Sequence, residues 1–66
     1  MRNENLNVDF WQRLIGKTIK LFLKNGFKYE GRLIAVCEDF IEIFDYKIQL
    51  NKILRIVDIA DLEVLR

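Results

Sequence analysis

Four carboxylates lie close together in the middle of the chain and are its best candidates for catalytic or metal-binding groups. They are Glu38, Asp39, Glu42 and Asp45. The chain has no histidine, no serine and a single cysteine, Cys37, so it lacks a nucleophile paired with a base and the ligands of a conventional zinc site. We therefore expect no enzymatic activity, no cofactor and no resident metal. Cys37 stands in an apolar stretch, which favours a small core residue over a reactive thiol.

Basic and aromatic residues alternate along residues 17–32, and this pattern suggests contact with nucleic acid. The residues are Lys17, Lys20, Lys24, Phe27, Lys28, Tyr29 and Arg32. Lysine and arginine bind phosphates and aromatic rings stack on bases, but any half-exposed strand also alternates charged with apolar residues. Both interpretations stay open, and the net charge of +1 does not point to nucleic acid.

The elements that must position these residues begin with a hairpin. Residues 17–24 and 27–36 read as two alternating strands joined at Asn25-Gly26, which is the strongest short hairpin signal. Gly31 lies inside the second strand, where a glycine usually marks a bulge or a bend. The sequence therefore predicts a curved hairpin that opens a small barrel.

The rest of the chain completes a single domain over residues 1–66. Residues 1–7 are polar and expected to be flexible, and a helix is predicted over 8–15, ended by Gly16. Phe10 and Leu14, with Trp11 beside them, can pack this helix as a lid over one end of the barrel.

Three further strands are predicted over residues 40–45, 47–50 and 53–59, with tight turns at Asp45-Tyr46 and Asn51-Lys52. The expected fold class is mostly β: a short N-terminal helix followed by a five-stranded, strongly bent antiparallel small barrel.

Assembly and location follow from the distribution of apolar and charged residues. The predicted strand 53–59 is apolar on both faces, which favours contact with another subunit, although a tightly rolled barrel could bury both faces itself. Residues 1–32 carry seven Lys/Arg against three Asp/Glu, whereas residues 33–66 carry four against seven. No apolar run approaches the length of a membrane span, and the N-terminus has no signal-peptide segment, so we expect a cytoplasmic protein without membrane contact.

The pattern Gly16-x-x-Ile-x-Leu-x-Leu-Lys-Asn-Gly-x-x-Tyr-x-Gly-x-Leu33 resembles the Sm/LSm family, which includes the Hfq-like RNA chaperones. The resemblance covers roughly residues 8–59. It implies an Sm-like protein that forms a homo-oligomeric ring of five to seven subunits and binds single-stranded RNA around a central pore. In such rings the fourth strand of one subunit pairs with the fifth strand of the next.

The resemblance also implies RNA-binding residues. The first family motif places Glu38, Phe40, Ile41 and Glu42 at its acidic, stacking, buried and base-reading positions. Phe40 suits stacking on a base. Glu42 stands where the family has asparagine, and because a carboxylate only accepts hydrogen bonds, the usual recognition of uridine is not expected.

The second family motif, an Ile-Arg-Gly turn between the last two strands, is matched to Ile48 through Ile53, without the arginine or the glycine. Asn51 can take the place of the glycine and Lys52 can supply a positive charge near the RNA backbone, but the two residues could equally form a solvated turn. The alternative function is therefore a ring that acts as a structural or protein-interaction module without RNA binding.

Overall fold

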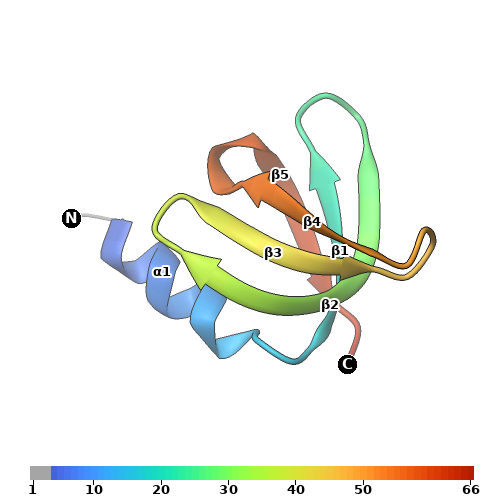
Figure 1. Ribbon diagram of the computed structural model, residues 1–66. Coiled ribbons are helices and arrows are strands. Elements are labelled where there is room, and N and C mark those ends of the chain that lie inside the picture. Colours follow the sequence, from blue (N-terminus) through green and yellow to red (C-terminus); the bar gives the residue numbers. More distant parts are fainter. Residues whose placement is uncertain (1–3) are drawn as a thin grey trace.

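A computed structural model describes residues 4–66 of the chain, with side chains from residue 9 onward. Helix α1 (Glu4–Arg13) precedes five strands: β1 (Thr18–Leu23), β2 (Lys28–Cys37), β3 (Phe40–Asp45), β4 (Leu50–Arg55) and β5 (Ile59–Val64). A single 3-10 turn, η1 (Ile56–Asp58), joins β4 to β5 (Figure 1). The strands form one antiparallel sheet in the order β4-β3-β2-β1-β5. The predicted fold class is confirmed, although the sheet is open, with β4 and β5 at its edges.

The opening hairpin forms where the sequence places it. Gly26 has a φ of 94°, which is a left-handed conformation that glycine adopts without strain. The Asn25 side-chain oxygen accepts a hydrogen bond from the Phe27 N–H at 3.0 Å, and the Leu23 N–H donates to the Phe27 carbonyl at 2.8 Å. These bonds close the tight turn that the Asn-Gly pair predicts.

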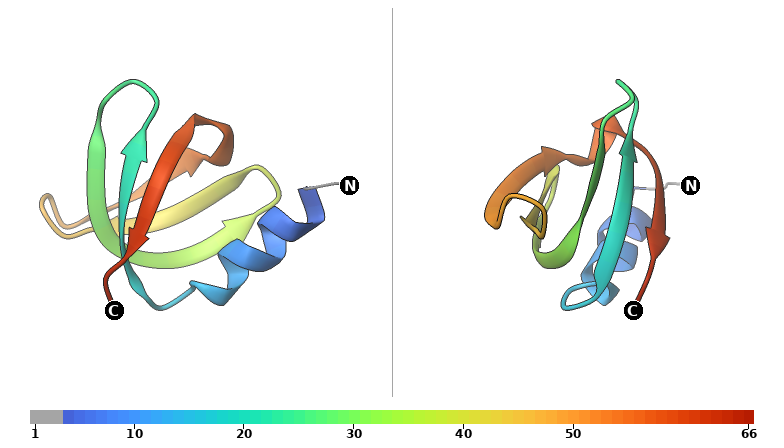
Figure 2. Two further views of the ribbon diagram at one scale, coloured as in Figure 1. Left: turned by 180° about the vertical axis from the view of Figure 1, so that it is seen from behind. Right: turned by 90° about the vertical axis from the view of Figure 1, so that its right-hand side faces the viewer.

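The predicted bend is at Gly31, where β2 passes from one neighbour to the other. Residues Lys28 to Arg32 pair with β1, while Gly31 to Cys37 pair with β3. Both views in Figure 2 show β2 curving through this point, so that β3 and β4 lie across from β1 and β5. A Cβ atom at Gly31 would lie 1.9 Å from the Phe44 carbonyl oxygen, so only glycine allows the two backbones to approach this closely.

The core consists of alternate residues from the three central strands. Ile19, Leu21, Leu33, Ile41 and Ile43 are all at most 1% exposed. From the helix segment, Trp11 and Leu14 close the core, whereas Phe10 is 44% exposed. The helix is therefore a lid, as predicted, but Phe10 is not one of the side chains that seal it.

The helix begins earlier than predicted. It spans Glu4–Arg13 rather than residues 8–15, and Gly16 follows it after a turn. Of residues 1–7, expected to be flexible, Glu4 to Asn7 belong to α1, while residues 1–3 lie outside the described part of the chain.

The predicted bounds of the last two strands, 47–50 and 53–59, were wrong. Residues 46–49 form a longer turn, in which Asp45 Oδ1 accepts a hydrogen bond from the Lys47 N–H at 2.8 Å and the Asp45 carbonyl accepts one from the Gln49 N–H at 2.7 Å. Asn51 and Lys52 then lie inside β4, opposite Phe44 and Ile43, and form no turn. The apolar run at 53–59 is half of β4 followed by η1, and the true last strand is the segment 59–64 that pairs with β1.

No helix within residues 4–66 is long and apolar enough to cross a membrane.

Candidate nucleic-acid interface

The outer face of β3 and β4 carries two of the predicted RNA-binding residues side by side. Along β3, Ile41, Ile43 and Asp45 are buried, so Phe40 and Glu42 point to the opposite face. Phe40 is 43% exposed and Glu42 is half-buried. Phe40 and Glu42 are two residues apart along β3, with the buried Ile41 between them, so their side chains are neighbours on this face.

Asn51 belongs to the same face and contacts Glu42 directly. Its side-chain Nδ2 donates a hydrogen bond of 2.7 Å to Glu42 Oε2. Asn51 pairs with Phe44 in the β3–β4 register and Glu42 pairs with Ile53, so the contact is diagonal between the two strands. The structure thus joins three of the four predicted residues on one surface, although Asn51 comes from a strand and not from the expected turn.

Lys52 does not belong to that surface. It pairs with the buried Ile43, so its side chain lies on the inner face of the sheet, where its Nζ sits 5.3 Å from the centre of the Tyr29 ring. This distance is within the range of a cation–π interaction. The prediction that Asn51 and Lys52 act together in a turn was therefore wrong: neighbours on a strand point to opposite faces.

Arg55 is a candidate that the sequence reasoning missed. It is the last residue of β4, it is exposed, and it is paired directly with Phe40 in the β3–β4 register. Side chains in such a cross-strand pair are neighbours, with Cβ atoms about 5 Å apart. Together, Phe40 and Arg55 place an aromatic and a basic residue at directly paired positions at this end of the sheet.

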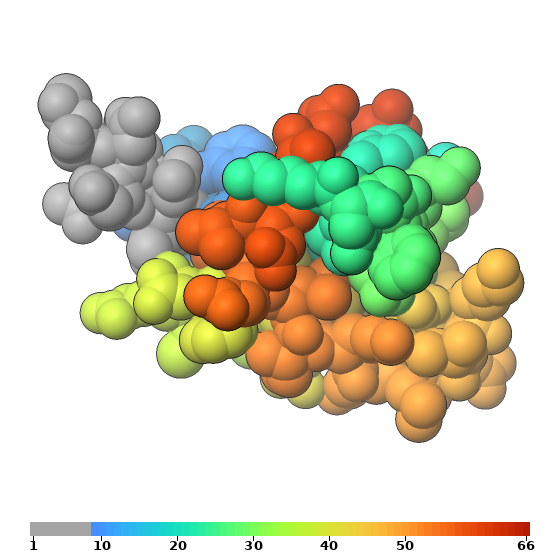
Figure 3. Space-filling model, turned by 90° about the horizontal axis from the view of Figure 1, so that it is seen from above, coloured from blue at the N-terminus to red at the C-terminus, as the bar shows by residue number. Residues whose placement is uncertain are grey.

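The two turns at this end are held together. The Ile56 N–H of η1 donates a hydrogen bond of 2.9 Å to the carbonyl of Asp39, between β2 and β3. In Figure 3 the η1 residues lie beside the beginning of β3. The residues of β4 and of the turn 46–49 continue from there along the lower side of the view. Phe40 and Arg55, which adjoin these turns, are therefore fixed relative to one another by backbone contacts.

A shallow apolar hollow adjoins Phe40. It has a volume of about 340 Å³ and is lined by Ala35, Val36, Cys37, Phe40, Ile41, Glu42 and Ile53. Cys37 is exposed here and is not the core residue that the sequence predicted. The reason is its position: it pairs with Phe40 at the last step of the β2–β3 ladder, so its side chain lies on the outer face, whereas the preceding residue, Val36, pairs with the buried Ile41.

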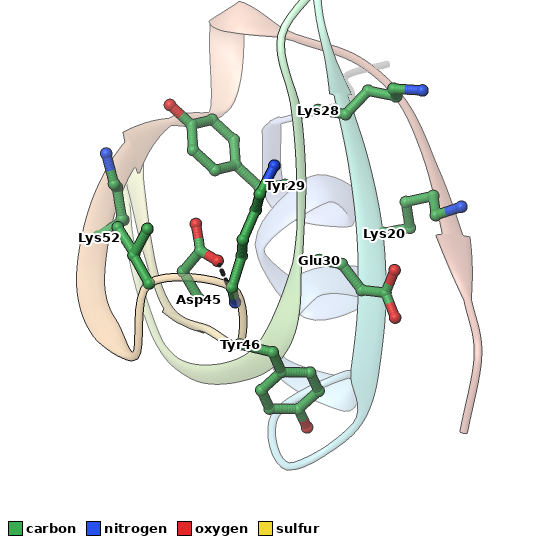
Figure 4. Close-up of a pocket in the computed structure, with 9 residues that line it drawn as sticks. Lys20, Lys28, Tyr29, Glu30, Asp45, Tyr46 and Lys52 are labelled. Atoms are coloured by element: carbon green, nitrogen blue, oxygen red, sulfur yellow. Dashed lines mark hydrogen bonds between the residues drawn. The ribbon is translucent and has the colours of Figure 1, made fainter.

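A second, basic hollow of about 670 Å³ lies at the other end of β3 (Figure 4). It is lined by Lys20, Lys28, Tyr29, Glu30, Asp45, Tyr46, Lys47, Ile48 and Lys52. Three residues of the basic and aromatic pattern at 17–32 thus take part, namely Lys20, Lys28 and Tyr29, while the others do not line it. Nucleic-acid contact at this surface stays a prediction.

Tyr46 ties the turn at this end to β1. Its hydroxyl shares a hydrogen bond of 2.9 Å with the Thr18 hydroxyl. This bond, assisted by Arg32, lowers the pKa of Tyr46 from its ordinary value. The turn 46–49 is therefore held at both its backbone and its side chains.

Comparison with known proteins adds no assignment, because no family model and no curated protein matches this chain. The candidate site is therefore defined by its own geometry: Phe40 and Arg55 paired across two strands, with Glu42 and Asn51 hydrogen-bonded beside them.

Proposed function

We propose that this protein is an Sm-like subunit that assembles into a homo-oligomeric ring and binds single-stranded RNA. The observation that carries the proposal is the pairing of Phe40 with Arg55 at the end of β3 and β4. The family's second motif has an arginine after an apolar residue in the connection between the last two strands. Leu54-Arg55 has this form at the end of β4, directly before the connection η1, although no glycine follows it.

The two side chains have the chemistry that a single-stranded base requires. An exposed aromatic ring stacks on any base, and each such contact is worth roughly 1–3 kcal/mol. A guanidinium stacks on bases as well and also binds phosphate through several N–H donors. Because the partners come from adjacent strands tied by the Ile56–Asp39 backbone bond, the site needs little reorganisation when RNA binds.

Assembly into a ring is supported by the two free edges of the sheet. The exposed edge residues of β4 include Leu50 and Ile53, which are 62% and 63% exposed, and Val64 of β5 is 48% exposed. The edges also differ in charge, because β4 carries Lys52 and Arg55 whereas β5 carries Asp61 and Glu63. Pairing of unlike edges is heterologous, and such contacts close into rings when the rotation allows it. Assembly would also protect edges that otherwise invite aggregation.

RNA binding is tested by fluorescence anisotropy with labelled oligo-A and oligo-U at low salt, alongside sedimentation velocity of the same samples. Phe40→Ala should weaken binding roughly 5- to 150-fold per stacked base. Phe10→Ala is the control, because Phe10 is a phenylalanine exposed to almost the same extent, 44% against 43%, but belongs to α1. Equal losses of RNA affinity in the two variants would contradict a specific role of Phe40 in binding.

Arg55→Gln tests the electrostatic contribution to RNA binding separately from base stacking on Phe40. If Arg55 binds phosphate, the salt dependence of binding should become shallower by about 0.7 log units per log unit of salt for each phosphate that the variant no longer neutralises. Arg13→Gln removes the same charge from the exposed end of α1 and should leave the slope unchanged. An unchanged slope for Arg55→Gln would contradict a phosphate contact.

A second candidate is a ring that serves as a structural or protein-interaction module. The observation that favours it is Glu42, whose negative charge would repeat in every subunit of a chain with a net charge of only +1. A protein that sediments as a ring but binds neither oligo-A nor oligo-U would favour this candidate. A monomer at micromolar concentration would contradict both candidates.

A further inference from the structure

Glu42 lies where it can hydrogen-bond to a base stacked on Phe40. Both side chains are on the outer face of β3, one strand repeat apart, which corresponds to a separation of about 7 Å between their Cα atoms. A base lying flat on the Phe40 ring extends several ångströms beyond it. Its Watson–Crick edge can therefore reach the carboxylate of Glu42.

The carboxylate is oriented by its neighbour. Asn51 Nδ2 donates to Oε2 at 2.7 Å, which restrains the side chain to this face and leaves Oε1 without that bond. Each carboxylate oxygen can accept more than one hydrogen bond, so both oxygens can still take part in recognition. The ionised carboxylate itself presents only acceptors, while the Asn51 amide uses one of its two hydrogens to hold the carboxylate in place.

We propose that Glu42 reads the Watson–Crick edge of the base stacked on Phe40 and that this site prefers guanine. The proposal rests on the RNA-binding function proposed above and specifies its substrate. Guanine presents two adjacent donors, N1–H and the N2 amino group, and these match the two oxygens of one carboxylate. Two charge-assisted hydrogen bonds of this kind are both directional and strong.

The other bases fit the same carboxylate less well. Uracil has one donor, N3–H, between two carbonyl oxygens that would face the carboxylate and repel it. Cytosine and adenine each offer one amino group beside a ring nitrogen that only accepts. The expected order of affinity is therefore guanine first, then adenine and cytosine, and uracil last.

The test uses seven-nucleotide RNAs with one variable base between two runs of three uridines. Uracil is the weakest expected ligand, so the flanking bases do not compete for the site, and RNAs with a single guanine form no quadruplexes. Binding of the wild-type protein is measured by fluorescence anisotropy with guanine, inosine, adenine, cytosine or uracil at the variable position. Inosine keeps N1–H and lacks the N2 amino group, so it removes one of the two proposed bonds. We expect guanine to bind about tenfold more tightly than uracil, with inosine between them.

Glu42→Gln is the matched variant, because glutamine keeps the shape and can still accept the hydrogen bond from Asn51. A neutral amide that both donates and accepts should abolish the preference for guanine over uracil and should strengthen binding of uracil, since a negative charge is removed. Glu30→Gln is the control: Glu30 is exposed on the β1–β2 hairpin, and its loss changes the charge equally.

The outcomes separate this inference from the function on which it rests. If no heptanucleotide binds at low salt, the proposed RNA binding fails. If the RNAs bind and Phe40→Ala weakens them, but guanine has no advantage or Glu42→Gln leaves the preference intact, RNA binding stands and the role of Glu42 is refuted. An inosine RNA that binds as tightly as the guanine RNA would contradict the two-bond geometry.

Discussion

Replacement of Gly31 by alanine tests the close approach of β2 and β3 on which the bent sheet depends. The added Cβ would lie 1.9 Å from the Phe44 carbonyl oxygen, 2.7 Å from its carbon and 3.2 Å from the Asp45 Cα, all of them backbone atoms. An ordinary contact begins at 3.4 Å, so the oxygen would have to retreat by 3.4 − 1.9 = 1.5 Å. A movement of that size exceeds the range of N–H···O bond lengths, and the local ladder between the two strands must open.

The cost can be set against the stability of the domain. Overpacking of a well-packed site costs about 1–3 kcal/mol, and each ladder bond that opens adds roughly 1 kcal/mol. With one ladder bond opened, we therefore expect Gly31→Ala to destabilise the protein by about 2–4 kcal/mol. A chain of 66 residues has a free energy of unfolding of roughly 3–10 kcal/mol, so much of the stability would be lost.

Urea unfolding followed by the fluorescence of Trp11 measures this loss, because Trp11 is the single tryptophan and is only 4% exposed where α1 packs on the core. Wild type and variants are compared at one protein concentration, since assembly also stabilises the fold. Gly26→Ala is the matched control: nothing lies within 4 Å of its added Cβ, and only its φ of 94° is strained, at a cost of about 1–2 kcal/mol. A Gly31→Ala protein as stable as Gly26→Ala would refute the close approach.

Two other predictions concern the sheet edge and the turn 46–49. Ile53→Asp should lower the sedimenting mass if β4 pairs with another subunit, whereas Phe27→Asp, at an almost equally exposed position, should not; equal behaviour of the two variants would contradict an interface at β4. Thr18→Ala should raise the pKa of Tyr46 toward its ordinary value, because it removes the main cause of the lowering, and titration by ultraviolet absorbance detects the shift. Since the folded state lowers the pKa of this acid, the linked stabilisation is present above the unfolded pKa and is lost as the pH falls through the folded pKa; a Tyr46 titration unaffected by Thr18→Ala would contradict the assignment.

The first half of the fold could be predicted because local residues determine it. Asn25-Gly26 specifies a tight turn, and Gly31 allows a backbone approach that no other residue permits. The second half depends on contacts between segments. Asn51 and Lys52 favour turns locally, yet pairing with Phe44 and Ile43 extends them into β4. The break at Ile56 to Asp58 contains no glycine or proline, and so it gives no local signal.

The misplaced connection between the last two strands also explains why the sequence grouped Lys52 with Asn51 and did not indicate Arg55. A turn at 51–52 makes Lys52 the cation nearest Phe40, but Lys52 faces Tyr29 inside the bent sheet. With β4 extended to Arg55, the register brings a guanidinium opposite Phe40 and brings Asn51 to Glu42. The site is thus set by the β3–β4 register, in which a slip of one residue would turn Asn51 and Arg55 to the inner face. A register set by the turn at 46–49 therefore controls which side chains meet at the far end of both strands. If the proposed RNA binding is correct, changes in that turn should alter RNA recognition although none of the proposed RNA-binding residues is replaced.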